Sequence, residues 1–213
     1  MFAHVAVARR AAGPDAEDRF LLGAALSDLA TFGGFRLLGR SPDDGIRAGM
    51  AFHHRSDDAF HGHAWFRSRN RTAVAALTAG GLGRGPSRAC AHVGVELLLD
   101  GALHAQPEDR RRFAAVLASS AGLVDELLPL VEPARRSAWA DHLARLAAVR
   151  GLPPYADPEA VVGRLHAICA RRPRLAFDAD GVAVVAQVLG GLAPSIAASG
   201  PDLVDELADR LRP

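Results

Sequence analysis

Residues 20–29 read Phe-Leu-Leu-Gly-Ala-Ala-Leu-Ser-Asp-Leu, and their spacing sets the expectation for the whole chain. Residues that share one face of an α-helix lie three or four positions apart. The members of this stretch with that spacing are Phe20, Leu21, Ala24, Ala25 and Asp28. The acids of 15–18 precede it, where a helix N-terminus favours negative charge, and Gly33-Gly34 interrupts it. We therefore expect an α-helix between these two signals.

Similar signals recur outward from this helix. Ser41-Pro42 has Ser at the cap and Pro at the first helical position, and we expect the helix that follows to run to about Arg71. Residues 80–86 form a glycine-rich connecting loop, after which Ser87 is expected to cap a helix. Further helices are expected up to about residue 105, from 107 onward, and over 121–131, 133–150, 157–171, 178–191 and 200–211. No alternating run is long enough for a strand, so the sequence predicts an all-α, single-domain fold over residues 1–213.

The composition narrows the classes of partner. The chain has 25 basic and 24 acidic residues and a net charge of +1, which does not favour nucleic-acid or membrane attraction. Cys90 and Cys169 lie far apart without a CxxC context, so we expect buried, reduced thiols, with a disulfide as the alternative. No apolar run approaches the roughly 20 residues needed to span a bilayer, and the charges of MFAHVAVARR follow its apolar stretch, unlike a signal peptide. We expect a cytoplasmic protein that binds neither nucleic acid nor membrane.

The densest group of polar side chains lies in residues 52–63, which hold four histidines. His53, Asp57 and His61 are spaced four apart and share one helix face. Imidazole and carboxylate at this spacing can bind one divalent ion of the Mn, Fe, Zn or Mg type. A solvated helix face with His–Asp hydrogen bonds is the alternative interpretation of the isolated pattern.

A second line of polar residues has the same spacing. His92, Glu96 and Asp100 are four apart within an otherwise apolar segment. Burying a carboxylate is costly unless it is paired or binds a metal, so these acids are candidate ligands. The alternative is that they face solvent or pair with arginines. Asp28 is also a single acid in an apolar helix, where a surface position is the commoner explanation.

Two arginine groups are candidates for binding phosphate. Arg67, Arg69 and Arg71 follow the histidine-rich segment, and a second group flanks Pro173. A solvated surface is the alternative for both groups, since guanidinium side chains are also common there. The sequence contains no GxSxG elbow and no dinucleotide fingerprint. The glycine-rich loop is not a P-loop, because it lacks the Gly-Lys-Ser/Thr ending.

Five segments in register resemble one family. They are residues 2–8 (FAHVAVA), 21–29 (LLGAALSDL), 48–63, 95–100 (VELLLD) and 170–175 (ARRPRL). The third holds His53, Arg55, Asp57, Phe60 and His63 in place. Together they are similar to the acyl carrier protein phosphodiesterases, over residues 2 to about 180. The resemblance implies an all-helical, multi-helix bundle related to the HD-type phosphohydrolases.

The resemblance also implies an activity and a site. Members of the family remove 4′-phosphopantetheine from holo-acyl carrier protein by metal-dependent hydrolysis, so the expected partner is an acyl carrier protein or another phosphate ester. Mn²⁺ is the favoured cofactor, with Fe or Mg as alternatives. The residues expected to line the metal pocket are His4, Asp28, His53, Asp57 and Asp100, with His92 and Glu96 as further ligands. Asp57, Asp100 and His61 are the candidate catalytic residues, and Arg55 and Arg172 the candidate phosphate-binding residues.

The chain departs from the family pattern at positions that bear on activity. Family histidines are replaced by Ala6, Ala51 and Gly101, a family asparagine by Ala24, and a family aspartate by His61. We expect His61 and His92 to compensate, since both lie one helical turn from retained acids. The alternatives are a divergent metalloenzyme with another reaction, including an oxidative one if iron is bound, and a non-catalytic binding protein on the same scaffold.

Overall fold

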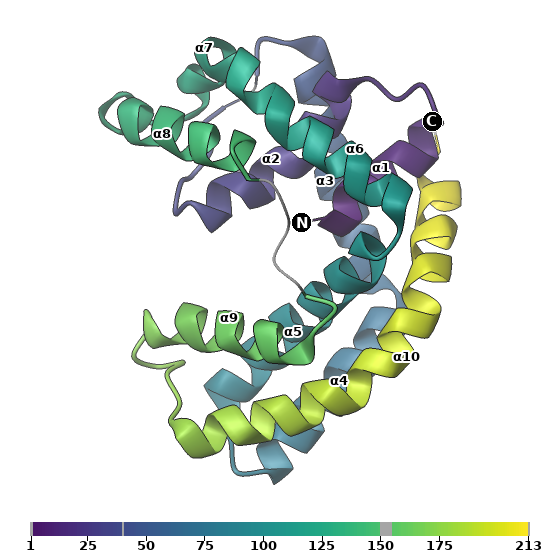
Figure 1. Ribbon diagram of the computed structural model, residues 1–213, viewed down its shortest axis with the longest axis vertical. Coiled ribbons are helices and arrows are strands. Elements are labelled where there is room, and N and C mark those ends of the chain that lie inside the picture. Colours follow the sequence, from purple (N-terminus) through teal and green to yellow (C-terminus); the bar gives the residue numbers. More distant parts are fainter. Residues whose placement is uncertain (1, 40, 150–154, 213) are drawn as a thin grey trace. The chain divides into compact units, whose positions relative to one another are not determined.

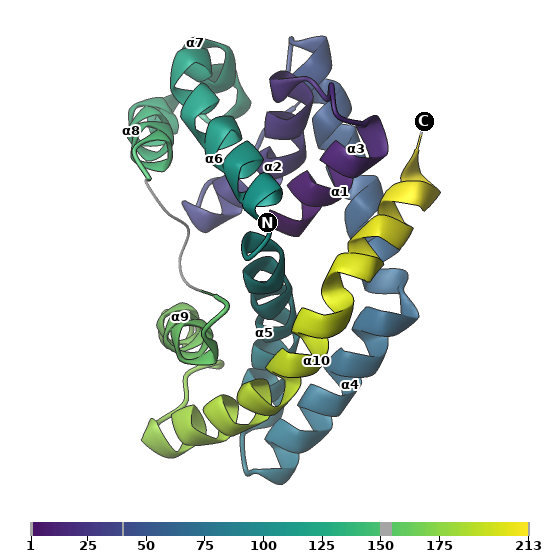
Figure 2. The same cartoon turned by 45° about the vertical axis from the view of Figure 1, so that its right-hand side comes forward.

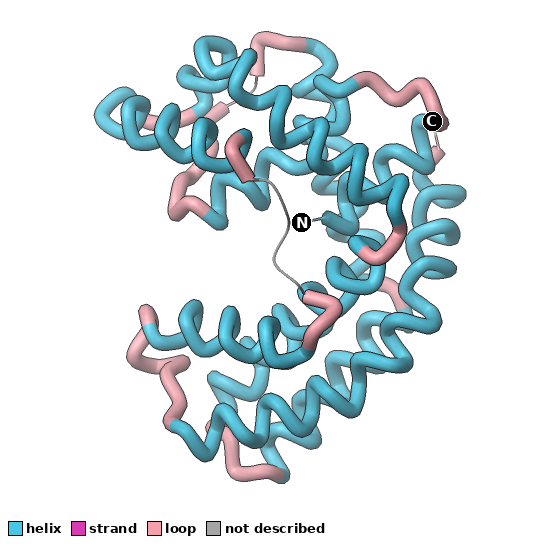
Figure 3. The backbone as a smooth tube through the Cα atoms, in the orientation of Figure 1, coloured by secondary structure: helices cyan, strands magenta, loops and turns pink. Residues whose placement is uncertain are grey.

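The computed structural model describes residues 2–39, 41–149 and 155–212, and no strand occurs among them (Figure 1 and Figure 3). The all-helical fold expected from the sequence is therefore confirmed. The α-helices are α1 Phe2–Ala12, α2 Asp18–Phe32, α3 Asp44–Gly62, α4 Ala64–Ala79, α5 Arg84–His104, α6 Pro107–Ser119, α7 Val124–Leu127, α8 Arg136–Ala147, α9 Pro158–Ala170 and α10 Ala179–Leu211. Three short 3₁₀ helices, η1 Ser120–Leu123, η2 Leu128–Leu130 and η3 Pro133–Arg135, lie around α7 and before α8.

The chain divides into two compact units whose segments alternate along the sequence. Unit 1 comprises Met1–Ala59, Gln106–Leu152 and Val204–Pro213, and unit 2 comprises Phe60–Ala105 and Pro153–Leu203. Helices α3 and α10 contribute residues to both units. The single-domain organisation and the HD-like arrangement stay predictions.

The histidine-rich helix is shorter than expected. α3 ends at Gly62, and His63 adopts an extended backbone with φ −74° and ψ 140°. Its imidazole Nδ1 accepts a hydrogen bond from the backbone N–H of Trp65 at 3.1 Å, which makes His63 the N-cap of α4. The expectation of one helix up to Arg71 was wrong, because a capping imidazole replaces the interrupted helical bonds.

Two other caps differ from their predictions. Asp43, rather than Ser41, caps α3 by accepting the N–H of Ile46 at 2.8 Å. Ser87 does not cap α5; it lies buried inside the helix, where its hydroxyl donates to the carbonyl oxygen of Leu82. α5 instead begins at Arg84, so the glycine-rich loop is shorter than expected.

The two helices expected near the C-terminus are a single helix, α10, which contains Pro194 and Pro201. Each proline removes one helical hydrogen bond, so an interruption was a reasonable expectation. The helix continues because its apolar residues Leu189, Ile196 and Leu203 are buried on both sides of the prolines. Tertiary packing therefore outweighs the local cost.

Unit 1 contains α1, α2 and α3, which lie next to one another in Figure 2; α1 packs on α2, and glycines bring α2 and α3 together. At the α2–α3 crossing, a Cβ on Gly49 would lie 2.0 Å from the carbonyl oxygen of Phe20. A Cβ on Gly23 would lie 2.2 Å from the carbonyl oxygen of Ile46. Only glycine at both positions allows the two backbones to approach this closely.

A buried ionic network also stabilises unit 1. The carboxylate of Asp109, at the start of α6, accepts from Arg9 and Arg10 at the end of α1, each at 2.6 Å. Asp109 is only 4% exposed, and Arg10 also pairs with the exposed Asp205 at 2.8 Å. The carboxylate thus joins the start of α6 to the end of α1, and the second partner of Arg10 adds the C-terminal part of α10.

Unit 2 contains α4, α5, α9 and the larger part of α10. Trp65 and Arg69 of α4 both donate to the hydroxyl of Ser199 in α10, at 2.8 and 2.9 Å. Cys90 and Cys169 are free and buried, as expected. Burial raises the pKa of Cys90 to about 12, which keeps the thiol protonated.

Two helical stretches, Pro107–Leu130 and Ala179–Leu211, are long and apolar enough to cross a membrane by length and composition. The expectation that no stretch approaches this length was therefore wrong, because Ala, Val and Leu keep the mean hydropathy high despite isolated polar residues. Core helices meet the same criterion, so this finding is weak evidence. A cytoplasmic location stays a prediction.

Candidate metal centre

Three candidate ligands from three helices converge in unit 1. His4 comes from α1, Asp28 from α2 and His53 from α3. One possible ligand atom of each lies within 4.8 Å of the other two. The two imidazole centroids are 4.5 Å apart, and both histidines are buried. We call this group the His4 cluster.

The α2–α3 crossing positions His53. Gly49 lies one helical turn before it and permits the close approach of α2. His53 Nδ1 therefore lies 3.0 Å from the backbone carbonyl oxygen of Ala24. Since a carbonyl oxygen can only accept, Nδ1 carries the proton, and in the neutral ring the lone pair is on Nε2.

Ser56 orients the other imidazole. Its hydroxyl donates to the carbonyl oxygen of His53 at 2.9 Å, so its oxygen is left to accept from Nδ1 of His4 at 2.8 Å. The lone pair of neutral His4 is consequently also on Nε2. Both rings thus have the tautomer of a metal-binding histidine whose other nitrogen is held by a hydrogen bond.

Burial favours the neutral form of His53. It lowers the pKa of His53 to about 4, and positive charge on His4 acts in the same direction. Burial raises the pKa of Asp28, but nearby positive charge lowers it by more, so the net shift is downward. At neutral pH the cluster therefore combines a neutral imidazole with a carboxylate, the protonation states that bind a divalent cation.

Asp57 and Arg55 lie on the same helix as His53. Asp57 Oδ1 is 3.5 Å from Nε2 of His4, and its side chain is 43% exposed. The guanidinium of the exposed Arg55 lies over the ring of Phe52, 5.4 Å from its centroid. The partly exposed carboxylate of Asp57 therefore lies beside the His4 cluster, and the positively charged side chain of Arg55 belongs to a residue two positions after His53.

The remaining predicted ligands belong to unit 2. His61, His92 and Glu96 form a second group whose ligand atoms lie within 4.8 Å of one another. Asp100 is buried one turn further along α5, and within the described ranges it belongs to neither group. Arg172 is an exposed residue that follows α9. The structure thus places His4, Asp28 and His53 in one cluster and His92 and Glu96 in another, and it leaves Asp57 and Asp100 outside both.

The structure also explains one departure from the family pattern. A Cβ on Gly101 would lie 2.2 Å from the backbone carbonyl carbon of Tyr155. No side chain fits there without displacing the 155–156 segment, so histidine is excluded by packing. Ala6 is buried, whereas Ala51 is exposed.

The sequence interpretation missed Ser56, which holds His4 in place. The available signal was its position three residues after His53, which places both side chains on neighbouring parts of one helix face. The acceptor on Ala24 is a backbone atom, so no residue type could have indicated it.

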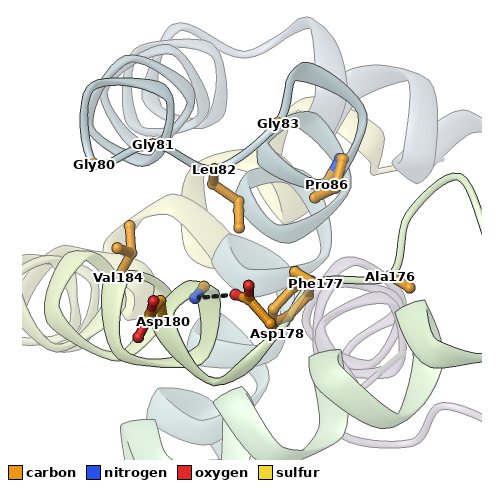
Figure 4. A pocket seen from close by; sticks show the side chains of 11 residues that line it. Gly80, Gly81, Leu82, Gly83, Pro86, Ala176, Phe177, Asp178, Asp180 and Val184 are labelled. Atoms are coloured by element: carbon orange, nitrogen blue, oxygen red, sulfur yellow. Dashed lines mark hydrogen bonds between the residues drawn. The ribbon is translucent and has the colours of Figure 1, made fainter.

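A separate pocket of about 420 Å³ in unit 2 contains none of the predicted site residues (Figure 4). It is lined by the loop Gly80–Gly83 and by the start of α10. Asp178 in its wall accepts the N–H of Gly181 at 3.0 Å, which caps α10. Of the two acids in the lining, Asp178 therefore has a structural role, and Asp180 lies in the first turn of α10.

No protein-family model, curated protein or solved structure matches this chain. The resemblance to the acyl carrier protein phosphodiesterases accordingly stays a prediction based on the five ordered segments. The functional argument rests on the His4 cluster and its surroundings.

Proposed function

We propose that the protein is a metal-dependent hydrolase of phosphate esters whose cation is bound by His4, Asp28 and His53. The observation that carries the proposal is the convergence of these three side chains from separate helices, with both imidazole Nδ1 atoms engaged in hydrogen bonds. Histidines that bind metals commonly have their other ring nitrogen held by a hydrogen bond of this kind. The phosphopantetheinyl diester of acyl carrier protein is the first substrate to test, on the basis of the sequence resemblance.

The donor set narrows the choice of cation. Two imidazoles and one or two carboxylates suit Mn²⁺, Fe²⁺ or Zn²⁺ better than Mg²⁺, which prefers oxygen ligands and its own water. Such a cation supplies charge that polarises a phosphoryl oxygen and makes a water molecule more acidic. The chain's own contribution is to orient the two imidazoles, to keep that of His53 neutral and to keep the Asp28 carboxylate ionised.

Asp57 and Arg55 would act on the substrate side of this cluster. A partly exposed carboxylate beside His4 can accept a proton from an attacking water molecule. Arg55 can donate two parallel hydrogen bonds to phosphate oxygens. In this assignment Asp57 is the candidate general base and Arg55 the candidate phosphate-binding residue.

A second candidate function follows from the same ligands. Two histidines and one carboxylate are also the ligand set of non-haem iron(II) oxygenases. His4, His53 and Asp28 match it in number and type. This alternative requires iron and predicts substrate-dependent oxygen consumption, whereas the hydrolase consumes no oxygen with any of its candidate cations.

Elemental analysis followed by an activity assay tests the proposal. Protein purified after Mn or Fe supplementation should contain a stoichiometric ion, and holo-acyl carrier protein incubated with it should lose its prosthetic group by mass spectrometry. Asp28→Asn should lose the ion. Asp57→Asn should keep it and lose at least about 100-fold in rate.

Asp58→Asn is the matched control, because Asp58 is an exposed carboxylate on the same helix. It should leave both the metal content and the rate unchanged. Protein without a stoichiometric ion under either supplement would contradict both enzymatic functions and favour a non-catalytic binding protein.

A further inference from the structure

A second set of candidate ligands lies in unit 2 and is not used by the proposed function. His61 comes from the last turn of α3, and His92 and Glu96 from successive turns of α5. Nε2 of His92 lies 3.0 Å from Oε1 of Glu96, and Nε2 of His61 lies 3.5 Å from the same oxygen. Each imidazole therefore directs its Nε2 atom towards the carboxylate of Glu96.

These distances match those between the ligands of a small tetrahedral ion. Ligand atoms about 2.05 Å from zinc are about 3.3 Å from each other in a tetrahedral site, and the two measured separations lie on either side of that value. The imidazole rings are stacked, with centroids 4.7 Å apart and 18° between their planes. All three ligand atoms, the two imidazole nitrogens included, lie within 4.8 Å of one another.

Aromatic packing holds the two imidazoles. The buried ring of Phe66 makes edge contacts with His61 and His92, at centroid distances of 4.7 and 5.2 Å. Phe60 packs on both His61 and Phe66, at 5.1 and 4.7 Å. A wall of apolar rings lowers the local dielectric constant, so a cation among these ligands is attracted more strongly than in water.

The opposite side of the group is accessible. The side chains of His61, Glu96 and His92 are 28%, 31% and 45% exposed. A bound ion would thus have three protein ligands and access to solvent at a fourth position, the arrangement of a zinc site that is not fully enclosed.

We propose that His61, His92 and Glu96 form a zinc site in unit 2, with two imidazoles, one carboxylate and one exchangeable position. Zinc is chosen because the donor set lacks the additional oxygens that Mg²⁺ and Ca²⁺ require. The simpler alternative is an imidazolium–carboxylate pair on a half-exposed surface, which contributes little to stability.

Zn²⁺ titration of the full-length, chelator-treated protein against a chromophoric competitor tests this site, with Co²⁺ absorption as a second readout. We expect His92→Ala and Glu96→Gln to lose one equivalent of bound ion, with affinity reduced by more than about 100-fold, and to lose the visible bands of tetrahedral Co²⁺. His166→Ala is the matched control, since His166 is an exposed histidine of the same unit. It should bind as the wild type does.

Comparison with Asp28→Asn separates this site from the His4 cluster. That variant should retain the zinc equivalent and the Co²⁺ bands, because Asp28 belongs to unit 1. If His92→Ala and Glu96→Gln bind as many ions as the wild type with equal affinity, the zinc site is wrong. Loss of the bands in Asp28→Asn alone would also overturn it, while leaving the proposed hydrolase intact. Circular dichroism confirms folding, and His92→Gln replaces His92→Ala if the latter fails to fold.

Discussion

At the scale of single residues, two buried histidines in unit 1 make similar hydrogen bonds, but only one of them lies beside other candidate metal ligands. His53 donates to the carbonyl oxygen of Ala24 and His142 to that of Leu29, at 3.0 and 2.9 Å. Burial is the largest cause of a lowered pKa in both. His53 faces two other candidate ligands, whereas the ring of His142 fills the space beside Gly33. Whether a buried histidine can bind a metal therefore depends on what surrounds the ring nitrogen that does not hydrogen-bond to the backbone.

Ser56→Ala tests the orientation of His4. The change removes the acceptor of His4 Nδ1, so we expect metal affinity to fall about 10- to 100-fold while stability falls by only about 1 kcal/mol. The matched control is Ser120→Ala, because Ser120 is also buried in unit 1 and also donates to the carbonyl three residues earlier, at 2.7 Å. Equal loss of metal affinity in both variants would contradict a positioning role for Ser56.

His142→Gln tests the acid sensitivity of unit 1. The pKa of His142 in the folded protein is below its ordinary value of about 6.5, so the unfolded chain binds more protons below that pH. Stability should consequently fall as the pH drops through about 6.5, and His53, with a pKa of about 4, acts in the same direction. Glutamine keeps an N–H donor but does not titrate. Urea unfolding at about pH 7 and about pH 5 should show a smaller loss in the variant; an unchanged loss would exclude His142 as a contributor.

At the scale of elements, the crossing of α2 and α3 is the feature on which the His4 cluster depends. Gly23 and Gly49 allow the backbones to touch, and the next turn of each helix supplies Asp28 or His53. The segment 20–29 predicted its helix correctly. Nothing in its periodicity indicated that Gly23 would meet Gly49, because a contact between helices depends on residues distant in sequence.

Gly49→Ala tests this crossing. Its new Cβ would lie 2.0 Å from the carbonyl oxygen of Phe20 and 2.8 Å from the backbone nitrogen of Ala24. We expect destabilisation by about 3 kcal/mol, measured by urea unfolding, together with loss of metal binding as α2 moves away. Gly163→Ala is the matched control in α9, where a Cβ would meet no atom within 4 Å. It should be neutral or stabilising by up to about 1 kcal/mol, and a similar loss in both variants would contradict the close crossing.

At the scale of the whole molecule, bound metal should stabilise the folded protein. A ligand that binds only the folded state at 100 times its Kd adds about 2.7 kcal/mol, so Mn²⁺ should raise Tm and a chelator should reverse the rise. Asp28→Asn should lose this response, and Asp58→Asn should keep it. Thermal unfolding with and without Mn²⁺ measures both, and an equal rise in the two variants would place the stabilising ion outside the His4 cluster.

The interleaved units explain why the candidate sites were only partly predictable. His53, Asp57 and His61 share one helix face, which favoured a single ion bound by one helix. In the structure, residues up to Ala59 belong to unit 1 and those from Phe60 onward to unit 2, so His53 and His61 have different partners. Helical spacing identifies which residues share a face, but it carries no information about which helix covers each turn of that face.

The sequence by itself determined the all-helical class found in the described residues and which polar side chains lie at helical spacing, and it favoured buried, reduced cysteines. These properties are local, because they depend on periodicity, capping and hydrophobicity within a few turns. Only the tertiary structure decided that His4, Asp28 and His53 meet, that Ser56 orients His4, and that Gly101 excludes a histidine. Those are contacts between segments about 25 to 55 residues apart, and backbone packing at glycine positions sets them.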